Sequence, residues 1–102
     1  MDYEFVVYGK ETCGLCKNRI IFLTNFIAKH SVSANIVYKN IENPEDLSDF
    51  ICFNAFNNFN ISVDEIPVVV LKKDDNVLKT WSGHAKEGVP TTPVILSLIG
   101  KE

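Results

Sequence analysis

Two cysteines separated by two residues, Cys13 and Cys16, constrain this chain more than any other feature. They follow an apolar run that favours a strand and precede a run that favours a helix, a context typical of a reversible dithiol. If the helix begins near Gly14, the Cys13 sulfur faces free backbone amides, which stabilise an anion. A thiolate in that position can have its pKa lowered from about 8.5 to roughly 3.5–7.5. Cys16 lies one turn later and is placed to attack a mixed disulfide formed by Cys13.

The length and composition predict one domain that spans residues 1–102. A total of 10 basic residues against 13 acidic ones gives a net charge of −3, which does not suggest nucleic acid as a partner. Three cysteines are too few for a secreted disulfide framework, and an odd number fits a reducing compartment. No signal peptide is visible, and no apolar run approaches the roughly 18 residues that span a bilayer. We therefore expect a cytoplasmic protein without a membrane partner.

Hydrophobic periodicity predicts four strands and three helices. The apolar run 3–8 favours a strand buried on both faces, whereas Ile20, Leu23 and Ile27 recur at helical spacing. The second helix begins with Asn43 as N-cap, because Pro44 suits the first helical position. The predicted elements are strand 3–8, helix 14–30, strand 34–41, a helix from residue 44, strands 68–71 and 77–81 around a turn at 73–76, and helix 92–98.

This order, β-α-β-α-β-β-α, predicts an α/β fold with a mixed four-stranded sheet and three helices. The first two strands are expected to be parallel because a helix crosses between them, and the last two form an antiparallel hairpin. Cys13 then lies at the carboxyl end of the first strand, where open α/β sheets usually place their sites.

The second predicted helix carries a less regular apolar pattern. Leu47, Phe50 and Ile51 are expected to form its buried face, and the phenylalanines of the segment 53–60 are expected to return to the core. Cys52 is expected to pack as a small buried hydrophobe, without a chemical role.

Three separated motifs resemble those of the thioredoxin superfamily, and within it the glutaredoxins and the glutaredoxin-like redoxins that reduce ribonucleotide reductase. Lys10 lies three residues before Cys13, as in the glutaredoxin pattern Lys-x-x-Cys-x-x-Cys. The segment 65–68 matches the one in which these proteins carry a cis-proline, here Pro67. The segment 81–84, Trp-Ser-Gly-His, is similar to the Trp-Ser-Gly-Phe of the redoxins.

The resemblance implies a thioredoxin-like fold and a protein-disulfide reductase whose redox-active disulfide joins Cys13 to Cys16. It also implies a substrate site around the dithiol, formed by Lys10, Leu15, Ile66, Pro67, Gly83 and His84. The backbone of Ile66 would pair with an extended substrate. Lys10, as a cation beside the thiolate, would favour the charged sulfur and could also receive a substrate carboxylate.

The expected partner is a disulfide-containing protein, and the resemblance makes ribonucleotide reductase the candidate acceptor. Thioredoxin reductase or glutathione would supply the electrons. No tightly bound cofactor is needed, because the dithiol itself carries the two electrons. After Gly83 the chain departs from glutaredoxins, which place an acidic residue there for glutathione, since His84, Ala85 and Lys86 follow instead. We expect the protein to be a monomer.

Other hypotheses assign the same residues differently. Cys13 could hold an iron–sulfur cluster at a dimer interface, as in some glutaredoxin-like proteins, and Gly14 leaves room for it. Alternatively, the aromatic run from 50 to 59 could be the contact surface of a redox-regulated interaction module. A closed zinc site is disfavoured because it needs four ligands, and only Cys52 and two histidines remain beside the pair.

Overall fold

The computed structural model describes residues 3–83 and 85–100 of the chain. Its elements are β1 (Tyr3–Gly9), α1 (Gly14–His30), β2 (Ala34–Asn40), α2 (Pro44–Phe56), η1 (Val63–Glu65), β3 (Val68–Lys73), β4 (Asn76–Ser82), η2 (Lys86–Gly88) and α3 (Thr92–Ile99), where η marks a short 3-10 turn. The predicted order of strands and helices is confirmed, and each predicted end lies within two residues of the observed one.

The four strands form one mixed sheet in the order β2-β1-β3-β4. Strand β1 lies inside the sheet, parallel to β2 and antiparallel to β3, and β3 and β4 form the predicted antiparallel hairpin. The hairpin turn contains no glycine, but Asp74 adopts a φ of +56° there. Aspartate tolerates this left-handed conformation better than most residues, so the chain can reverse within two residues.

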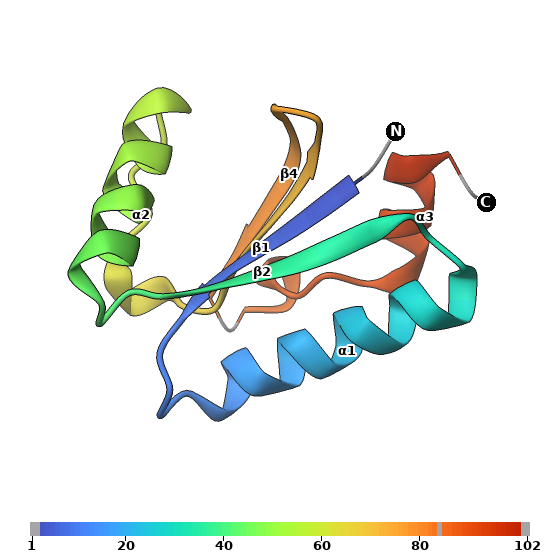
Figure 1. Ribbon diagram of the computed structural model, residues 1–102, viewed down its shortest axis with the longest axis horizontal. Helices are drawn as coiled ribbons and strands as arrows, with labels where there is room; N and C mark the ends of the chain where they lie inside the picture. Colours follow the sequence, from blue (N-terminus) through green and yellow to red (C-terminus); the bar gives the residue numbers. More distant parts are fainter. Residues whose placement is uncertain (1–2, 84, 101–102) are drawn as a thin grey trace.

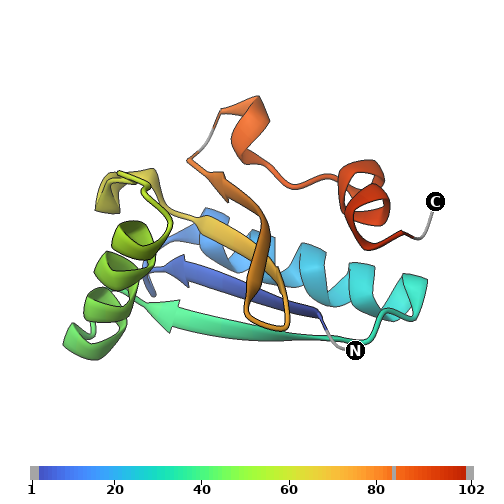
Figure 2. The same cartoon turned by 90° about the horizontal axis from the view of Figure 1, so that it is seen from above.

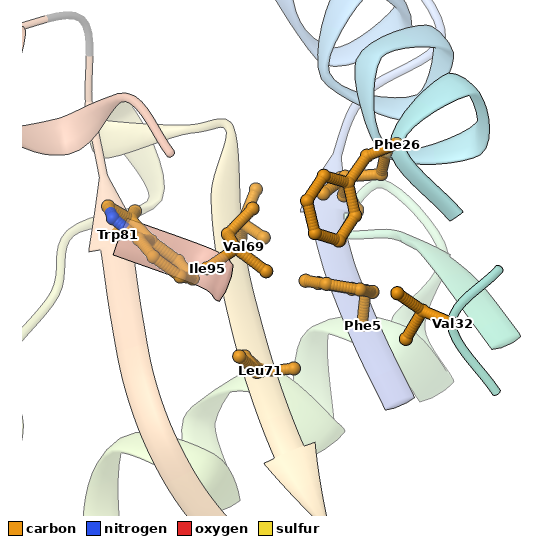
Figure 3. Packing of buried hydrophobic residues seen from close by; sticks show 9 residues of the cluster. Phe5, Phe26, Val32, Val69, Leu71, Trp81 and Ile95 are labelled. Carbon is orange, nitrogen blue, oxygen red and sulfur yellow. The ribbon is translucent and has the colours of Figure 1, made fainter. Parts of the chain in front are cut away.

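Helices cover both faces of the sheet, because alternate residues of the inner strands point to opposite sides (Figures 1 and 2). On one face Phe5 of β1, Phe26 of α1 and Ile95 of α3 belong to one buried cluster, in which Figure 3 shows Phe26 next to Phe5. On the other face Val6 packs with Phe50 of α2. The result is a three-layer arrangement in which β1 is buried on both sides, as predicted from its apolar run.

The helices begin and end at the residues that favour such boundaries. The side chain of Asn43 accepts a hydrogen bond of 3.0 Å from the Glu45 N–H, and Pro44 opens α2, as predicted. Helix α3 ends at Ile99 and is capped by Gly100, whose φ is +74°. Within residues 3–83 and 85–100, no helix is both long and apolar enough to cross a membrane.

The outer side of α2 differs from the prediction. Phe50 is buried and Leu47 packs beside it, but Ile51 is 58% exposed and Cys52 is exposed as well. Successive helical residues are rotated by about 100°, so residues 51 and 52 turn away from the side that carries Phe50. The prediction therefore gave α2 a wider buried face than one contact with the sheet can cover.

The end of α2 corrects a second prediction. Phe53 returns to the core, where its ring lies 5.8 Å from the ring of Tyr8. Phe59 rests against Phe53 and is partly exposed, whereas Phe56 is 87% exposed. A hollow of about 710 Å³, lined by Phe53, Phe56 and Val70 among others, separates the end of α2 from the sheet. Phe56 therefore lines this hollow and leaves most of its side chain exposed.

A polar contact attaches α2 to the two strands beside it. The hydroxyl of Tyr8 donates a hydrogen bond of 2.8 Å to Oδ2 of Asp49, and Nζ of Lys39 lies 3.2 Å from the same oxygen. Burial, followed by the hydrogen bond to Asp49 and by nearby carboxylates, raises the pKa of Tyr8 far above its usual range. The phenol therefore stays protonated in the folded protein at pH values where an unfolded tyrosine ionises.

The Tyr8→Phe variant is expected to lose about 1 kcal/mol of unfolding free energy at pH 8, the typical net contribution of one hydrogen bond. This contribution is complete below pH about 10, the pKa of an unfolded tyrosine, and decreases at higher pH because ionisation then favours the unfolded chain. Urea unfolding of both proteins from pH 8 to 11 measures it. A wild-type advantage that stays constant up to pH 11 would contradict the assignment.

Candidate functional site

The dithiol lies where the loop after β1 meets the first turn of α1. Cys13 is the N-cap of α1, and its N–H donates to the carbonyl of Lys10 at 3.1 Å. The Sγ of Cys13 accepts a hydrogen bond of 3.1 Å from the N–H of Cys16. The two cysteines are joined by a disulfide, with their Cα atoms 5.3 Å apart. The two cysteines of the predicted pair are therefore placed to form a disulfide with each other.

The two sulfurs differ in their access to solvent. Cys16 is 1% exposed and belongs to the buried cluster on the α2 face, whereas Cys13 is only half-buried at the edge of that cluster. The first turn of α1 carries no acidic residue that would oppose a negative charge on Cys13. A disulfide that arrives from solution can thus reach Cys13 and not Cys16.

The predicted proline loop lies against the dithiol. The Ile66–Pro67 bond is cis, as predicted, and both residues are buried. Ile66 is in the same buried cluster as Cys16, and Cys13 packs against that cluster. Tertiary packing therefore brings together two motifs that lie about half the chain apart in the sequence.

Gly83 extends this arrangement from the end of β4. Its N–H donates a hydrogen bond of 2.6 Å to the carbonyl of Glu65, the residue before Ile66. The φ of Gly83 is +81°, a conformation that favours glycine. Gly83 thus lies beside the proline loop, while His84, the other residue predicted from this motif, lies outside the described residues.

Lys10 and Leu15 flank the dithiol on the solvent side. Lys10 is half-buried and, with Cys16 and Lys17, lines a hollow of about 340 Å³. Leu15 is 39% exposed on the first turn of α1, between the two cysteines. Of the predicted site residues that the structure describes, all lie at or beside this end of the sheet. Their roles in binding a substrate remain predictions.

Two residues of the site were missed in the sequence. A Cβ atom on Gly9 would stand 2.6 Å from Sγ of Cys16 and 3.4 Å from Cε1 of Tyr38. Glycine is therefore required at the end of β1, because the buried sulfur and the tyrosine ring occupy the space of a side chain. For Gly9, the available signal was a glycine at the end of an apolar strand, just before the dithiol. Nothing local marks Tyr38.

The described residues contain no group of three or more histidine, cysteine, aspartate or glutamate side chains arranged to hold a metal ion. Cys52, the remaining cysteine, is exposed on α2. The hypothesis of a cluster shared between two chains through Cys13 involves a partner and stays untested.

The fold is shared with known thioredoxins. No protein-family model and no curated protein sequence matches the chain. Among solved structures, a malarial protein is similar over 99% of this chain and 97% of its own, with a TM-score of 0.64 and 13% identity. Thioredoxin Deadhead of Drosophila melanogaster is similar over 98% of this chain and 80% of its own (TM-score 0.60, 15% identity). Fasciola hepatica thioredoxin is similar over 99% and 82% (TM-score 0.58, 16% identity).

The chain has a thioredoxin-like fold. This confirms the predicted fold class, with three helices and a four-stranded mixed sheet. Identities of 13 to 16% show a common fold and do not separate a glutaredoxin from a thioredoxin. The activity must therefore be argued from the site itself.

Proposed function

We propose that the protein is a dithiol–disulfide oxidoreductase that reduces disulfides of other proteins through Cys13 and Cys16. The observation that carries the proposal is the asymmetric pair, in which a half-buried N-cap sulfur is bonded to a fully buried one. In the reduced protein, the N–H groups at the start of α1 favour the thiolate form of Cys13 over the thiol. Cys13 is then the nucleophile.

The reaction consists of two exchanges. The Cys13 thiolate attacks one sulfur of a substrate disulfide, forms a mixed disulfide and releases the other substrate sulfur, which takes up a proton. Cys16 loses its proton and attacks the Cys13 sulfur, so the bond to the substrate breaks and the Cys13–Cys16 disulfide forms. Two electrons pass to the substrate, which leaves with two thiols.

The loop that contains Ile66 and Pro67 is the candidate substrate-binding segment, with Lys10, Leu15 and Gly83 around it. Support comes from their position beside the dithiol and from the packing of Ile66 with Cys16. A peptide that extends along the backbone of Ile66 would carry its disulfide toward Cys13. His84 is proposed as part of this rim on the resemblance alone.

We further propose a glutaredoxin-like role in the cytoplasm as a monomer without a resident cofactor. Its electrons would come from glutathione or a thioredoxin reductase. Ribonucleotide reductase is the proposed acceptor, because the segment 81–84 resembles that of redoxins that reduce this enzyme. The odd number of cysteines supports the reducing compartment.

Reduction of a disulfide-bonded protein such as insulin, with dithiothreitol as electron source, tests the activity without assuming a natural reductant. The wild type and a Cys52→Ser control, altered only at the exposed cysteine of α2, are expected to catalyse the reaction. Cys13→Ser is expected to reduce the rate to that of dithiothreitol alone, because no other sulfur at the site is reachable. Wild-type turnover in Cys13→Ser would refute the proposal.

A second measurement separates the electron sources. The oxidised wild type is mixed with glutathione in one arm and with a thioredoxin reductase and NADPH in the other, and the loss of the disulfide is followed by thiol titration. Faster reduction by glutathione would support the glutaredoxin-like assignment. Faster reduction by the flavoenzyme would contradict that assignment and favour a thioredoxin type.

A further inference from the structure

The buried cysteine of the pair, Cys16, lines a hollow beside the dithiol. This hollow lies between the first turns of α1 and the end of β2, on the edge of the sheet, and has a volume of about 340 Å³. Its lining residues are Lys10, Glu11, Cys16, Lys17, Ile20 and Tyr38. Cys16 thus borders an open space although only 1% of its surface is exposed. Some other group must cover its sulfur.

Tyr38 is the aromatic residue that lines this hollow together with Cys16. A Cβ on Gly9 would lie 2.6 Å from Sγ of Cys16 and 3.4 Å from Cε1 of Tyr38, so the sulfur and the edge of the ring both lie beside the bare Cα of Gly9. Ile20, one helical turn after Cys16, also lines the hollow. Tyr38 itself is 38% exposed, so its side chain borders both the hollow and the solvent.

Parallel strand pairing fixes the tyrosine in this place. Tyr38 is opposite Val7 in the register of β1 and β2, and Gly9 follows two residues later on the same strand as Val7. Burial, and after it the charges of Glu11, Glu42 and Asp46, raise the pKa of Tyr38, so its phenol is neutral at physiological pH. The charged groups facing the hollow are Lys10, Glu11 and Lys17.

We propose that Tyr38 is a positioning residue that shields the sulfur of Cys16, so that Cys16 reacts with the Cys13 sulfur and not with thiol reagents or disulfides from solution. This inference rests on the proposed function and concerns its second step. In that step Cys16 must attack the sulfur of Cys13 and expel the substrate thiolate. An unshielded Cys16 would instead attack a second disulfide from solution and become capped by a mixed disulfide of its own.

The test measures Cys16 directly, in a Cys13→Ser, Cys52→Ser protein where it is the only thiol. Its rate of alkylation by iodoacetamide is followed at fixed pH by mass spectrometry. Tyr38→Ala is expected to react about tenfold faster than the parent, because loss of the ring lets water reach the sulfur and favours the thiolate, and one unit of thiol pKa changes the thiolate content about tenfold. Tyr38→Phe is expected to react like the parent, because it retains the ring.

Ile36→Ala is the matched control. Ile36 lies two residues earlier on β2, on the same face, and packs against the core, but it does not line the hollow. Equal acceleration in Ile36→Ala and Tyr38→Ala would show general loosening and overturn the proposal, as would an unchanged rate in Tyr38→Ala or a raised rate in Tyr38→Phe.

Urea unfolding shows whether Tyr38→Ala folds, and a variant that removes less of the side chain is used if it does not. Tyr38→Leu then replaces it, and a rise in alkylation rate above that of Ile36→Ala supports the proposal, whereas the parent rate contradicts it. These measurements do not depend on turnover. Fast alkylation in Tyr38→Ala together with wild-type turnover in Cys13→Ser would refute the proposed function and leave the shielding intact.

Discussion

A Cys16→Ser protein is expected to stop after the first exchange and to remain covalently attached to its substrate. The half-buried Cys13 can still attack a disulfide, but the buried group one turn later no longer has a sulfur that can expel the substrate. Only a thiol from solution can then release the adduct. Such a bimolecular attack lacks the advantage of a correctly held intramolecular group, which can reach effective concentrations on the order of 10⁵ M or more.

The adduct can be measured directly. Reduced Cys16→Ser is mixed with an equimolar disulfide-bonded protein without other thiols, and the products are separated on a non-reducing gel and identified by mass. A stable one-to-one conjugate that dithiothreitol dissolves is expected. Cys13→Ser is expected to form none, and Cys16→Ser, Cys52→Ser is expected to form the same conjugate. A conjugate linked through Cys52 would contradict the mechanism.

The parts of the site that local chemistry determines could be predicted from the sequence. Cys13 lies at a helix N-terminus because a strand, a short loop and a helix follow one another in that order, and each has a clear pattern. The motif around Pro67 and the glycine at residue 83 were recognised by resemblance. Their placement beside the dithiol needed only the strand order, since β1 and β3 are neighbours.

The parts that depend on contacts between distant strands could not be predicted. Tyr38 is one aromatic residue in a strand-like run, and nothing near it in the sequence indicates that its ring lies beside Gly9, on the hollow that Cys16 also lines. That placement requires the parallel register of β1 and β2, together with the absence of a side chain at Gly9. A one-residue change in register would turn Tyr38 to the opposite face of the sheet.

The errors in α2 have a related origin. The apolar residues Ile51 and Phe56 suggested a broad buried face, but α2 packs against the sheet along the side that carries Leu47, Phe50 and Phe53. Composition and periodicity give the number of apolar residues in a helix, whereas tertiary packing decides how many of them are covered. Cys52 was assigned to the core because free cysteine often packs as a small buried hydrophobe, and its exposure is a correction.

Replacing Phe5 with alanine is expected to have the largest effect on stability in this chain. Phe5 lies on an inner strand, is fully buried, and meets Phe26 edge to face with the ring centroids 6.5 Å apart. Figure 3 shows its ring between the side chains of Phe26 and Val32. Truncation of a buried phenylalanine typically costs about 3–5 kcal/mol, out of the roughly 5–15 kcal/mol that stabilise a domain of ordinary size.

Urea unfolding of the oxidised proteins measures this loss, and Ile51→Ala provides the matched control. Ile51 is a large apolar residue of α2 that is 58% exposed, so its truncation is expected to change the unfolding free energy by less than about 0.5 kcal/mol. The decisive quantity is the difference between the losses of unfolding free energy in Phe5→Ala and Ile51→Ala. Similar losses of unfolding free energy in both variants would mean that the outer side of α2 is buried after all. They would also mean that the apolar layer between the sheet and helices α1 and α3 does not supply most of the stability of the core.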